Sequence, residues 1–332
     1  MSKLWISACA LALVVAGPAM AAPQLKILDT IKIGGKGHWD YATFDAVHQR
    51  ILLSHNDTIA SVDLDGQKVN PHLAAAVGSH IALPLPDQAS FLITNGKANT
   101  VTLNDAVTGE VRTTIATDTG PDGAVLDPVS GDAFVMANHG GMVDVIDTKK
   151  AGVKAHIAVG GAPEGAAADG AGHIFTHLED KNALVVIDAK SDTVQASYTM
   201  EDCDEPSGLA YADDGDLLLS ACHNGIARVT DAATGKEVAK LPIGKQPDYA
   251  IYDAGRKLGY IPCGDGTLTV IDFSGKTPVV AQVLATRPGA RTAALDPATG
   301  RLYLPTADFA PAAVGTRPAV IDDSFKVVVV GP

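Results

Sequence analysis

The sequence has few basic residues and few cysteines, and each shortage limits what the protein can be. Its 25 lysines and arginines stand against 38 aspartates and glutamates, which gives a formal net charge of −13. Binding to nucleic acid draws most of its affinity from clustered lysine and arginine, so the sequence predicts no nucleic-acid partner. Only Cys203, Cys222 and Cys263 follow the first 21 residues, enough for one internal disulfide and one thiol.

Local signatures of catalysis are also absent. The chain contains no Gly-x-Ser-x-Gly elbow, no glycine-rich phosphate loop and no Cys-x-x-Cys pair. Recurrent tips such as Pro-Val-Ser-Gly at 128–131 are typical of turns. Any active site must therefore be assembled from segments that lie far apart in the sequence.

Apart from residues 1–21, no apolar run is long enough to predict a membrane span. Lys3, the apolar run at 4–17 and the small-x-small triplet Ala19-Met20-Ala21 together predict an export signal over residues 1–21. We expect the mature chain to begin near Ala22 and to form a single domain over residues 22–332. The expected location is the periplasm or the exterior of the cell, and the expected state is a monomer.

A repeat with a period of 40 to 43 residues organises the rest of the chain. Short segments of the type GAVLD (123–127) and YAIYD (249–253) start at positions 41, 81, 123, 165, 208, 249 and 292. A second series follows runs such as DVID: Asp63, Asp105, Asp147, Asp188, Asp231, Asp272 and Asp322. Its last interval is 50 residues, which predicts an insertion of roughly eight residues in the final repeat.

Each repeat divides into four short apolar runs separated by Gly, Asp, Asn and Pro, which favours strands over helices. Seven such units predict an all-β protein, a seven-bladed β-propeller with four antiparallel strands per blade. Residues 25–33 and 325–330 both look like outermost strands, and one of them is expected to complete the last blade beside strands from the other end of the chain.

The repeats resemble a known family. Segments such as GPDGAVLDPVSGDAFVMAN with MVDVIDTKKAG, and QPDYAIYD with LTVIDFSGK, are similar to the units of YVTN-repeat propellers, and the closing RLYLPTADF and SFKVVVVGP resemble YncE-like proteins. The resemblance covers residues 25–332. It implies a propeller and favours binding over a known reaction, but it implies no particular chemistry.

In such a repeat, the loop that enters the inner strand and the loop between the second and third strands should open on one face. The residue before each inner strand should then lie near the central channel, which gives Asp40, His80, Asp122, Glu164, Ser207, Asp248 and Arg291. The second set of loops adds His55, His139, His177 and His223, so that with His38 and His80 six of the ten histidines share this channel-mouth face. Polar hairpin tips alone would produce a similar pattern.

Three kinds of site are predicted there. The candidate ligand-binding residues are His38, Trp39, Asp40, His55, His80, Asp122, Glu164, Asp248 and Arg291. The candidate metal ligands are His139, His177 and His223, because imidazole suits zinc, copper, iron or nickel, and a transition-metal ion is the one cofactor suggested. Cys203 and Cys222 should both reach the top of one blade and form a disulfide, which leaves Cys263 unpaired. The alternatives are a metal role for Cys222 and ordinary free thiols.

For two residues and one segment of this face, the sequence allows both a functional and a structural role. Arg291 either clamps a carboxylate or phosphate, or forms an ion pair with Asp248 or Asp40. Trp39 is either a stacking surface for a ligand or a plug between blades. The insertion at 307–318 is either a lid over the mouth or a structural flap.

The leading hypothesis is an exported propeller that binds a small molecule or a protein partner at the channel mouth. The alternative is a metal-assisted hydrolase or lyase that acts on an anionic small molecule such as a lactone or sugar acid. A scaffold that binds partners on the sides of its blades is a third possibility.

Overall fold

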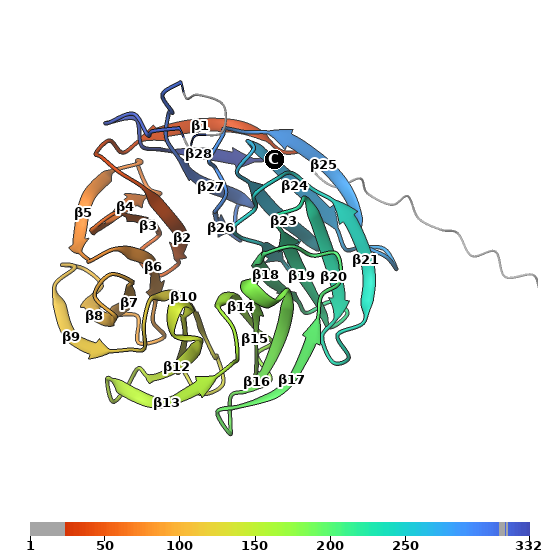
Figure 1. Ribbon diagram of the computed structural model, residues 1–332. Helices are drawn as coiled ribbons and strands as arrows, with labels where there is room; N and C mark the ends of the chain where they lie inside the picture. The colour runs from red at the N-terminus through yellow and green to blue at the C-terminus, as the bar shows by residue number, and fades with distance from the viewer. Residues whose placement is uncertain (1–23, 312–315, 317) are drawn as a thin grey trace, which may run out of the picture.

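Seven four-stranded antiparallel sheets surround a central axis in the computed structural model, which describes residues 24–311, 316 and 318–332 (Figure 1). The expected seven-bladed β-propeller is confirmed. The predicted export signal at 1–21 lies outside the described residues. In the described part of the chain, no helix has the length and apolar character required to cross a membrane.

Blades 1 to 4 follow the chain in order, with the first strand of each nearest the axis. Blade 1 contains β2 (Trp39–Asp45), β3 (Arg50–His55), β4 (Thr58–Asp63) and β5 (Val69–Ala75). Blade 2 contains β6 (Ser79–Pro84), β7 (Ser90–Asn95), β8 (Thr100–Asp105) and β9 (Val111–Ala116). Blade 3 contains β10 (Pro121–Leu126), β11 (Ala133–Ala137), β12 (Met142–Asp147) and β13 (Gly152–Ala158), and blade 4 contains β14 (Pro163–Ala168), β15 (His173–Leu178), β16 (Ala183–Asp188) and β17 (Thr193–Thr199).

Blades 5 to 7 follow, and the inner strands of blades 6 and 7 are only three residues long. Blade 5 contains β18 (Pro206–Ala212), β19 (Leu217–Cys222), β20 (Ile226–Asp231) and β21 (Glu237–Pro242). Blade 6 contains β22 (Ile251–Asp253), β23 (Leu258–Cys263), β24 (Thr267–Asp272) and β25 (Val279–Ala285). Blade 7 combines β26 (Ala294–Asp296), β27 (Arg301–Thr306) and β28 (Lys326–Gly331) with β1 (Lys26–Lys32).

The position of a strand within its blade explains its composition. β11 and β12 are sandwiched between neighbouring blades, and they read AFVMA and MVDVID with nearly every residue buried. The outermost β13 alternates between exposed and covered residues because only one of its faces packs. The apolar core therefore lies between blades: Phe134 and Val145 of blade 3 share one cluster with Ile174 and Val185 of blade 4.

The N-terminal strand closes the ring. β1 pairs antiparallel with β28 and is the outermost strand of blade 7, as expected for one of the two terminal segments. The segment at 325–330, which was expected to be an outermost strand, instead supplies most of β28, the third strand of that blade, so this prediction is wrong. On the inner side, the Thr292 hydroxyl donates a hydrogen bond of 2.8 Å to the Asp40 carbonyl of blade 1.

The prediction that Asp322 follows the third strand of the seventh blade is wrong. The run before it makes only an isolated bridge, between Phe309 and Val320, whereas the third strand is β28. Nineteen residues thus separate β27 from β28, compared with two between β3 and β4. The extension formed by residues 307–325 is therefore longer than the predicted insertion. The prediction failed because the apolar run before Asp322 and the run at 325–330 both fit the place of the third strand in the repeat.

Both sets of loops open on the same face, as predicted. The backbone N–H of Asn56 donates to the His38 carbonyl at 3.0 Å, and the N–H of Gly264 donates to the Gln246 carbonyl at 2.8 Å. Equivalent bonds join the two loops in blades 2 to 5. We keep the name channel-mouth face for this side of the ring.

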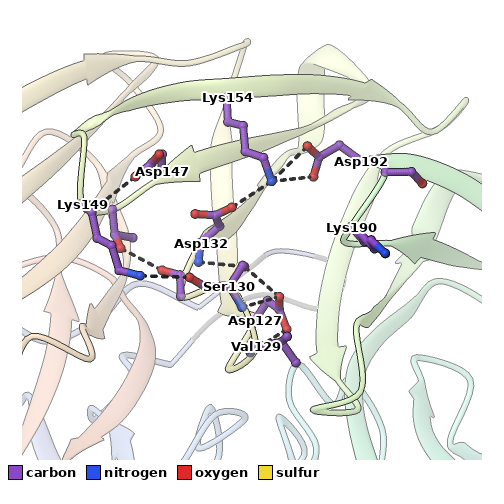
Figure 2. Close-up of polar contacts among 12 residues, drawn as sticks. Asp127, Val129, Ser130, Asp132, Asp147, Lys149, Lys154, Lys190 and Asp192 are labelled. Carbon is purple, nitrogen blue, oxygen red and sulfur yellow. Dashed lines mark hydrogen bonds and ion pairs between the residues drawn. The ribbon is translucent and has the colours of Figure 1, made fainter.

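The opposite face carries the turns between the first and second strands of each blade. Figure 2 shows that the Asp127 carboxylate accepts hydrogen bonds from the N–H groups of Val129 and Ser130 and from the Ser130 hydroxyl. Beside this turn, Lys154 lies between Asp132 at 3.0 Å and Asp192 of the next blade at 3.1 Å. This supports the assignment of the repeated tips to turn formation.

Gly165 is expected to be indispensable because a neighbouring backbone occupies the space where a side chain would lie. A Cβ at Gly165 would stand 1.8 Å from the Ser207 carbonyl oxygen, whereas a Cβ at Gly152 would have no atom within 4 Å. Gly165→Ala is expected to lower the free energy of unfolding by about 1–3 kcal/mol or more, the range for overpacking. Gly152→Ala is the matched control and should change it little. Equal denaturant midpoints for the two variants would contradict this close approach.

Candidate functional site

Acidic side chains from separate blades meet at the axis. His80 lies between two of them: its Nδ1 is 2.7 Å from Asp40 Oδ2 and 3.3 Å from Asp122 Oδ1. Asp40, His80, Asp122 and Glu164 are each the second residue of an inner strand. In those strands the pairing register shifts at this point, and such a bulge redirects side chains. We call Asp40, His80, Asp122, Glu164 and Asp248 the axial cluster.

Arg291 joins the axial cluster as an ion-pair partner. Its Nε lies 3.0 Å from Asp248 Oδ2, so the ion-pair interpretation of this residue is confirmed. Because β22 and β26 are short, both residues lie in loops, where the Asp248 N–H also donates to the Arg291 carbonyl at 3.3 Å.

Glu164 is held by two residues that the sequence did not single out. The Tyr41 hydroxyl donates to Glu164 Oε1 at 3.4 Å, and the Asn138 amide donates to Glu164 Oε2 at 3.0 Å. Asn138 also donates to Glu179 at 3.3 Å, and Tyr41 packs edge-on against Tyr249. Tyr41 directly follows Asp40 in the sequence, and Tyr249 directly follows Asp248. This repeated Asp-Tyr pair is a signal that could have revealed the two tyrosines, whereas Asn138 has no such signal.

Burial and mutual repulsion set the charge of the axial cluster. Burial, opposed by the charge of His80 and reinforced by Asp40, raises the pKa of Asp122 to about 7. Burial and the charge of Asp122 raise the pKa of Glu164 well above its usual range. Burial raises the pKa of Asp248 to about 6 despite the nearby Arg291. Several of these carboxyl groups are therefore poised to hold protons near neutral pH.

His80 is held in its charged form, whereas the carboxyl groups are held toward their neutral form. Burial disfavours its charged form, but the hydrogen bond to Asp40 and the charges of Asp122 and Asp40 outweigh burial and raise the pKa of His80 to about 9. The imidazolium that results lies between two carboxyl groups and reduces the repulsion between them.

The donors of Asp40, His80 and Asp122 lie within 4.8 Å of one another and could hold a metal ion. Imidazole with carboxylates suits a transition metal. Among the described residues, the other group with this spacing is Asp118, Asp144 and His156, on the outer side of blade 3.

The three histidines predicted as metal ligands are not brought together. His139 and His223 lie on the second-to-third-strand connections of blades 3 and 5, His177 lies within β15 of blade 4, and the three form no group with metal-ligand spacing among the described residues. His139 is exposed, His177 is fully buried against the Ser220 hydroxyl at 2.9 Å, and His223 contacts Glu205 at 2.8 Å. Burial lowers the pKa of His177 to about 3, as is typical of a neutral core histidine.

A cavity of about 850 Å³ opens on the channel-mouth face beside the axial cluster. It is bounded by loops of blades 1, 5, 6 and 7 and by the extension after β27. Of the nine predicted ligand residues, His38, Trp39 and Arg291 line it. The sequence did not single out Gln246, Arg287 or Phe309, which also line it.

Trp39 packs between blades 1 and 7 and also lines the cavity. Its ring stacks on Phe325 with centroids 5.7 Å apart and meets Phe309 at 6.0 Å, and it lines the cavity. His55 is buried behind it, stacked on Phe325 at 4.2 Å, and burial lowers the pKa of His55. His55 thus supports the wall of the cavity without lining it.

Cys203 and Cys222 form a disulfide, with Cα atoms 5.2 Å apart. The bond ties the loop before β18 to the end of β19. Cys263 is a buried free thiol, and burial raises the pKa of Cys263 to about 12, so its thiol is inert.

No protein-family model matches this chain, and no curated protein matches it. Solved structures do match. Hydrazine synthase from Kuenenia stuttgartiensis is 19% identical with a TM-score of 0.71, over 83% of this chain and 94% of that one. A chain of the mitotic checkpoint complex is 14% identical with a TM-score of 0.74, over 100% of this chain and 98% of that one.

This is a seven-bladed β-propeller. At such low identity the likeness shows the fold alone, and the propeller fold is compatible with binding either small ligands or proteins. The comparisons therefore leave the chemistry of the site to its own residues.

His80→Gln is expected to lower the free energy of unfolding near neutral pH by about 1–3 kcal/mol, the cost of leaving buried groups without their partner. Because the folded-state pKa of His80 is raised from 6.5 to about 9, its stabilising charge is complete below pH 6.5 and is lost as the pH rises through 9. The difference between the variant and the parent protein should therefore shrink on going from about pH 6 to about pH 10.

Chemical unfolding at several pH values measures this difference. His72→Gln changes an exposed histidine of β5 and should leave stability unchanged. A difference that stays constant over the whole pH range would show that His80 acts through packing and not through its charge.

Proposed function

We propose that this protein is an exported, YncE-like propeller of the YVTN-repeat type that binds a small organic ligand in the cavity on its channel-mouth face. The observation that carries the proposal is the cavity itself. It combines about 850 Å³, an aromatic wall at Trp39 and Phe309, and charged groups at Arg287 and Arg291. Small-molecule sites typically have this size and this mixture of apolar walls and a few polar groups.

Export is supported by the pattern of residues 1–21 and by the Cys203–Cys222 pair, because disulfides persist in oxidising compartments. A protein partner at the same face is the other form of this proposal. The two structural relatives illustrate the range of the fold, since one is a hydrazine synthase and the other belongs to a mitotic checkpoint complex.

Trp39 offers a direct test. The chain has two tryptophans, Trp5 and Trp39, so the full chain with Trp5→Phe retains Trp39 alone. Labelled with 5-fluorotryptophan, it should give a single ¹⁹F resonance from the cavity wall. We expect members of a small-molecule library containing anions, cations and neutral compounds to shift this resonance in a saturable way.

Phe309→Ala should weaken that binding because it removes part of the wall. Tyr198→Ala is the control, because Tyr198 lines a separate groove on the outside of blades 4 and 5. If no compound of any charge shifts the resonance, while a protein partner is captured through this face, the small-ligand proposal is wrong.

A second candidate is metal-assisted hydrolysis or lyase chemistry on an anionic small molecule. The observation that favours it is the donor group of Asp40, His80 and Asp122, which lies close to Arg291. A metal there would supply Lewis-acid activation of water or of a carbonyl. Arg291 would orient the anionic substrate.

Elemental analysis of protein purified without an affinity tag tests this second candidate. It predicts stoichiometric metal that is lost in His80→Ala and retained in His48→Ala, since His48 lies in a turn after β2 and contacts Asp45. Protein that neither carries metal nor takes it up would exclude this chemistry.

A further inference from the structure

The charged side chains that line the cavity differ in whether they have partners within the protein. Asp308 is engaged, because its carboxylate forms an ion pair with Lys326 and its backbone N–H bonds to the Ser324 hydroxyl at 2.9 Å. His223 is likewise occupied by Glu205 at 2.8 Å. The carboxylate of Asp308, the one acidic side chain among the described lining residues, is therefore neutralised within the protein.

The two arginines are not neutralised to the same extent. Arg287 is exposed, and in the described part of the chain its guanidinium forms no hydrogen bond or ion pair. Arg291 contacts Asp248 through Nε, and that is the one side-chain ion pair it makes among residues 24–311, 316 and 318–332. Its two terminal nitrogens are left to bind a ligand.

The backbone holds these arginines on one short turn. The Ala290 N–H donates to the Arg287 carbonyl at 3.1 Å, and the Arg291 N–H donates to the Gly289 carbonyl at 3.0 Å. Gly289 has a φ of +77°, and a Cβ there would stand 2.7 Å from the Phe309 ring and 3.2 Å from the Trp39 ring. The turn thus places the arginines directly beside the aromatic wall.

The axial cluster offsets the charge of Arg291 in part, through Asp248, and leaves that of Arg287 unpaired among the described residues. None of its five residues is among the described residues that line the cavity. The Asp248 carboxylate is already paired with Arg291, and His80 is paired with Asp40 and Asp122. A ligand in the cavity therefore meets guanidinium groups first.

We infer that the cavity selects an organic anion, a flat ring compound that carries a carboxylate. Guanidinium groups only donate hydrogen bonds, and their fork matches the two oxygens of a carboxylate. Trp39 and Phe309 offer ring faces and edges for a planar body. This inference rests on the proposed ligand site and adds the chemical class of the ligand.

Isothermal titration calorimetry of the full chain with three probes tests the inference. The probes are 2-naphthoate, its neutral amide 2-naphthamide, and 2-naphthylmethylammonium, which share one ring and differ in charge. We expect naphthoate to bind about tenfold or more tightly than the amide, as a charge-assisted hydrogen bond allows, and the ammonium not to bind.

Arg287→Gln is the main variant, because the Arg287 guanidinium has no hydrogen-bond or ion-pair partner among the described residues whose loss would disturb the fold. It should weaken naphthoate binding about tenfold and leave amide binding unchanged. Arg291→Gln should act in the same direction. Arg301→Gln is the matched control, since Arg301 is exposed at the start of β27 and lies outside the cavity.

The outcomes separate the two proposals. Equal binding of naphthoate and naphthamide, or equal effects of Arg287→Gln and Arg301→Gln, would overturn the anion inference while the Trp39 resonance still reports a ligand site. Tighter binding of the ammonium would also overturn it, because the axial carboxylates would then govern the site. If no probe binds the calorimetric sample, the inference is wrong. If the library also leaves the Trp39 resonance unchanged, the proposed function fails as well.

Discussion

The close approach of neighbouring inner strands around one axis is the constraint on which the rest of this structure depends. At Gly165 and Gly208 the adjacent backbone fills the space of a side chain, and hydroxyls such as that of Ser207 bond across to the next blade at 2.8 Å. Because the inner strands stand so near, the residues at their entrances are forced into one small volume. The axial cluster follows from this geometry.

That crowding also explains the electrostatics of the channel. Four carboxyl groups of the axial cluster share a poorly solvated space with one imidazole and one guanidinium. In such a setting proton uptake relieves repulsion between carboxylates, and each cation becomes tied to a specific acid. His80 is paired with Asp40 and Arg291 is paired with Asp248, so the charges of the axial cluster largely offset one another. The exposed positive charge beside the cavity is that of Arg287.

The last blade breaks the symmetry and creates the cavity. Its third strand is delayed by 19 residues after β27, and part of that extension faces Trp39 and the arginine turn. A perfectly regular seventh repeat would have had a short connection here. The departure from the repeat, more than the repeat itself, distinguishes one side of the channel-mouth face from the others.

The sequence by itself determined the blade number, the strands in each blade, the shared face of the two loop sets and the ring from Asp40 to Arg291. These follow from a local period that repeats in phase, and a closed ring converts equal spacing along the chain into equal position in space. Only the tertiary structure decided that β1 is the outermost strand of blade 7 and that Asp322 is not a repeat marker. It also decided that His139, His177 and His223 lie apart, and that Arg287 and Phe309 line the cavity with Trp39. Which side chains touch depends on bulges, loop length and packing between blades, and a repeat period carries no information about these.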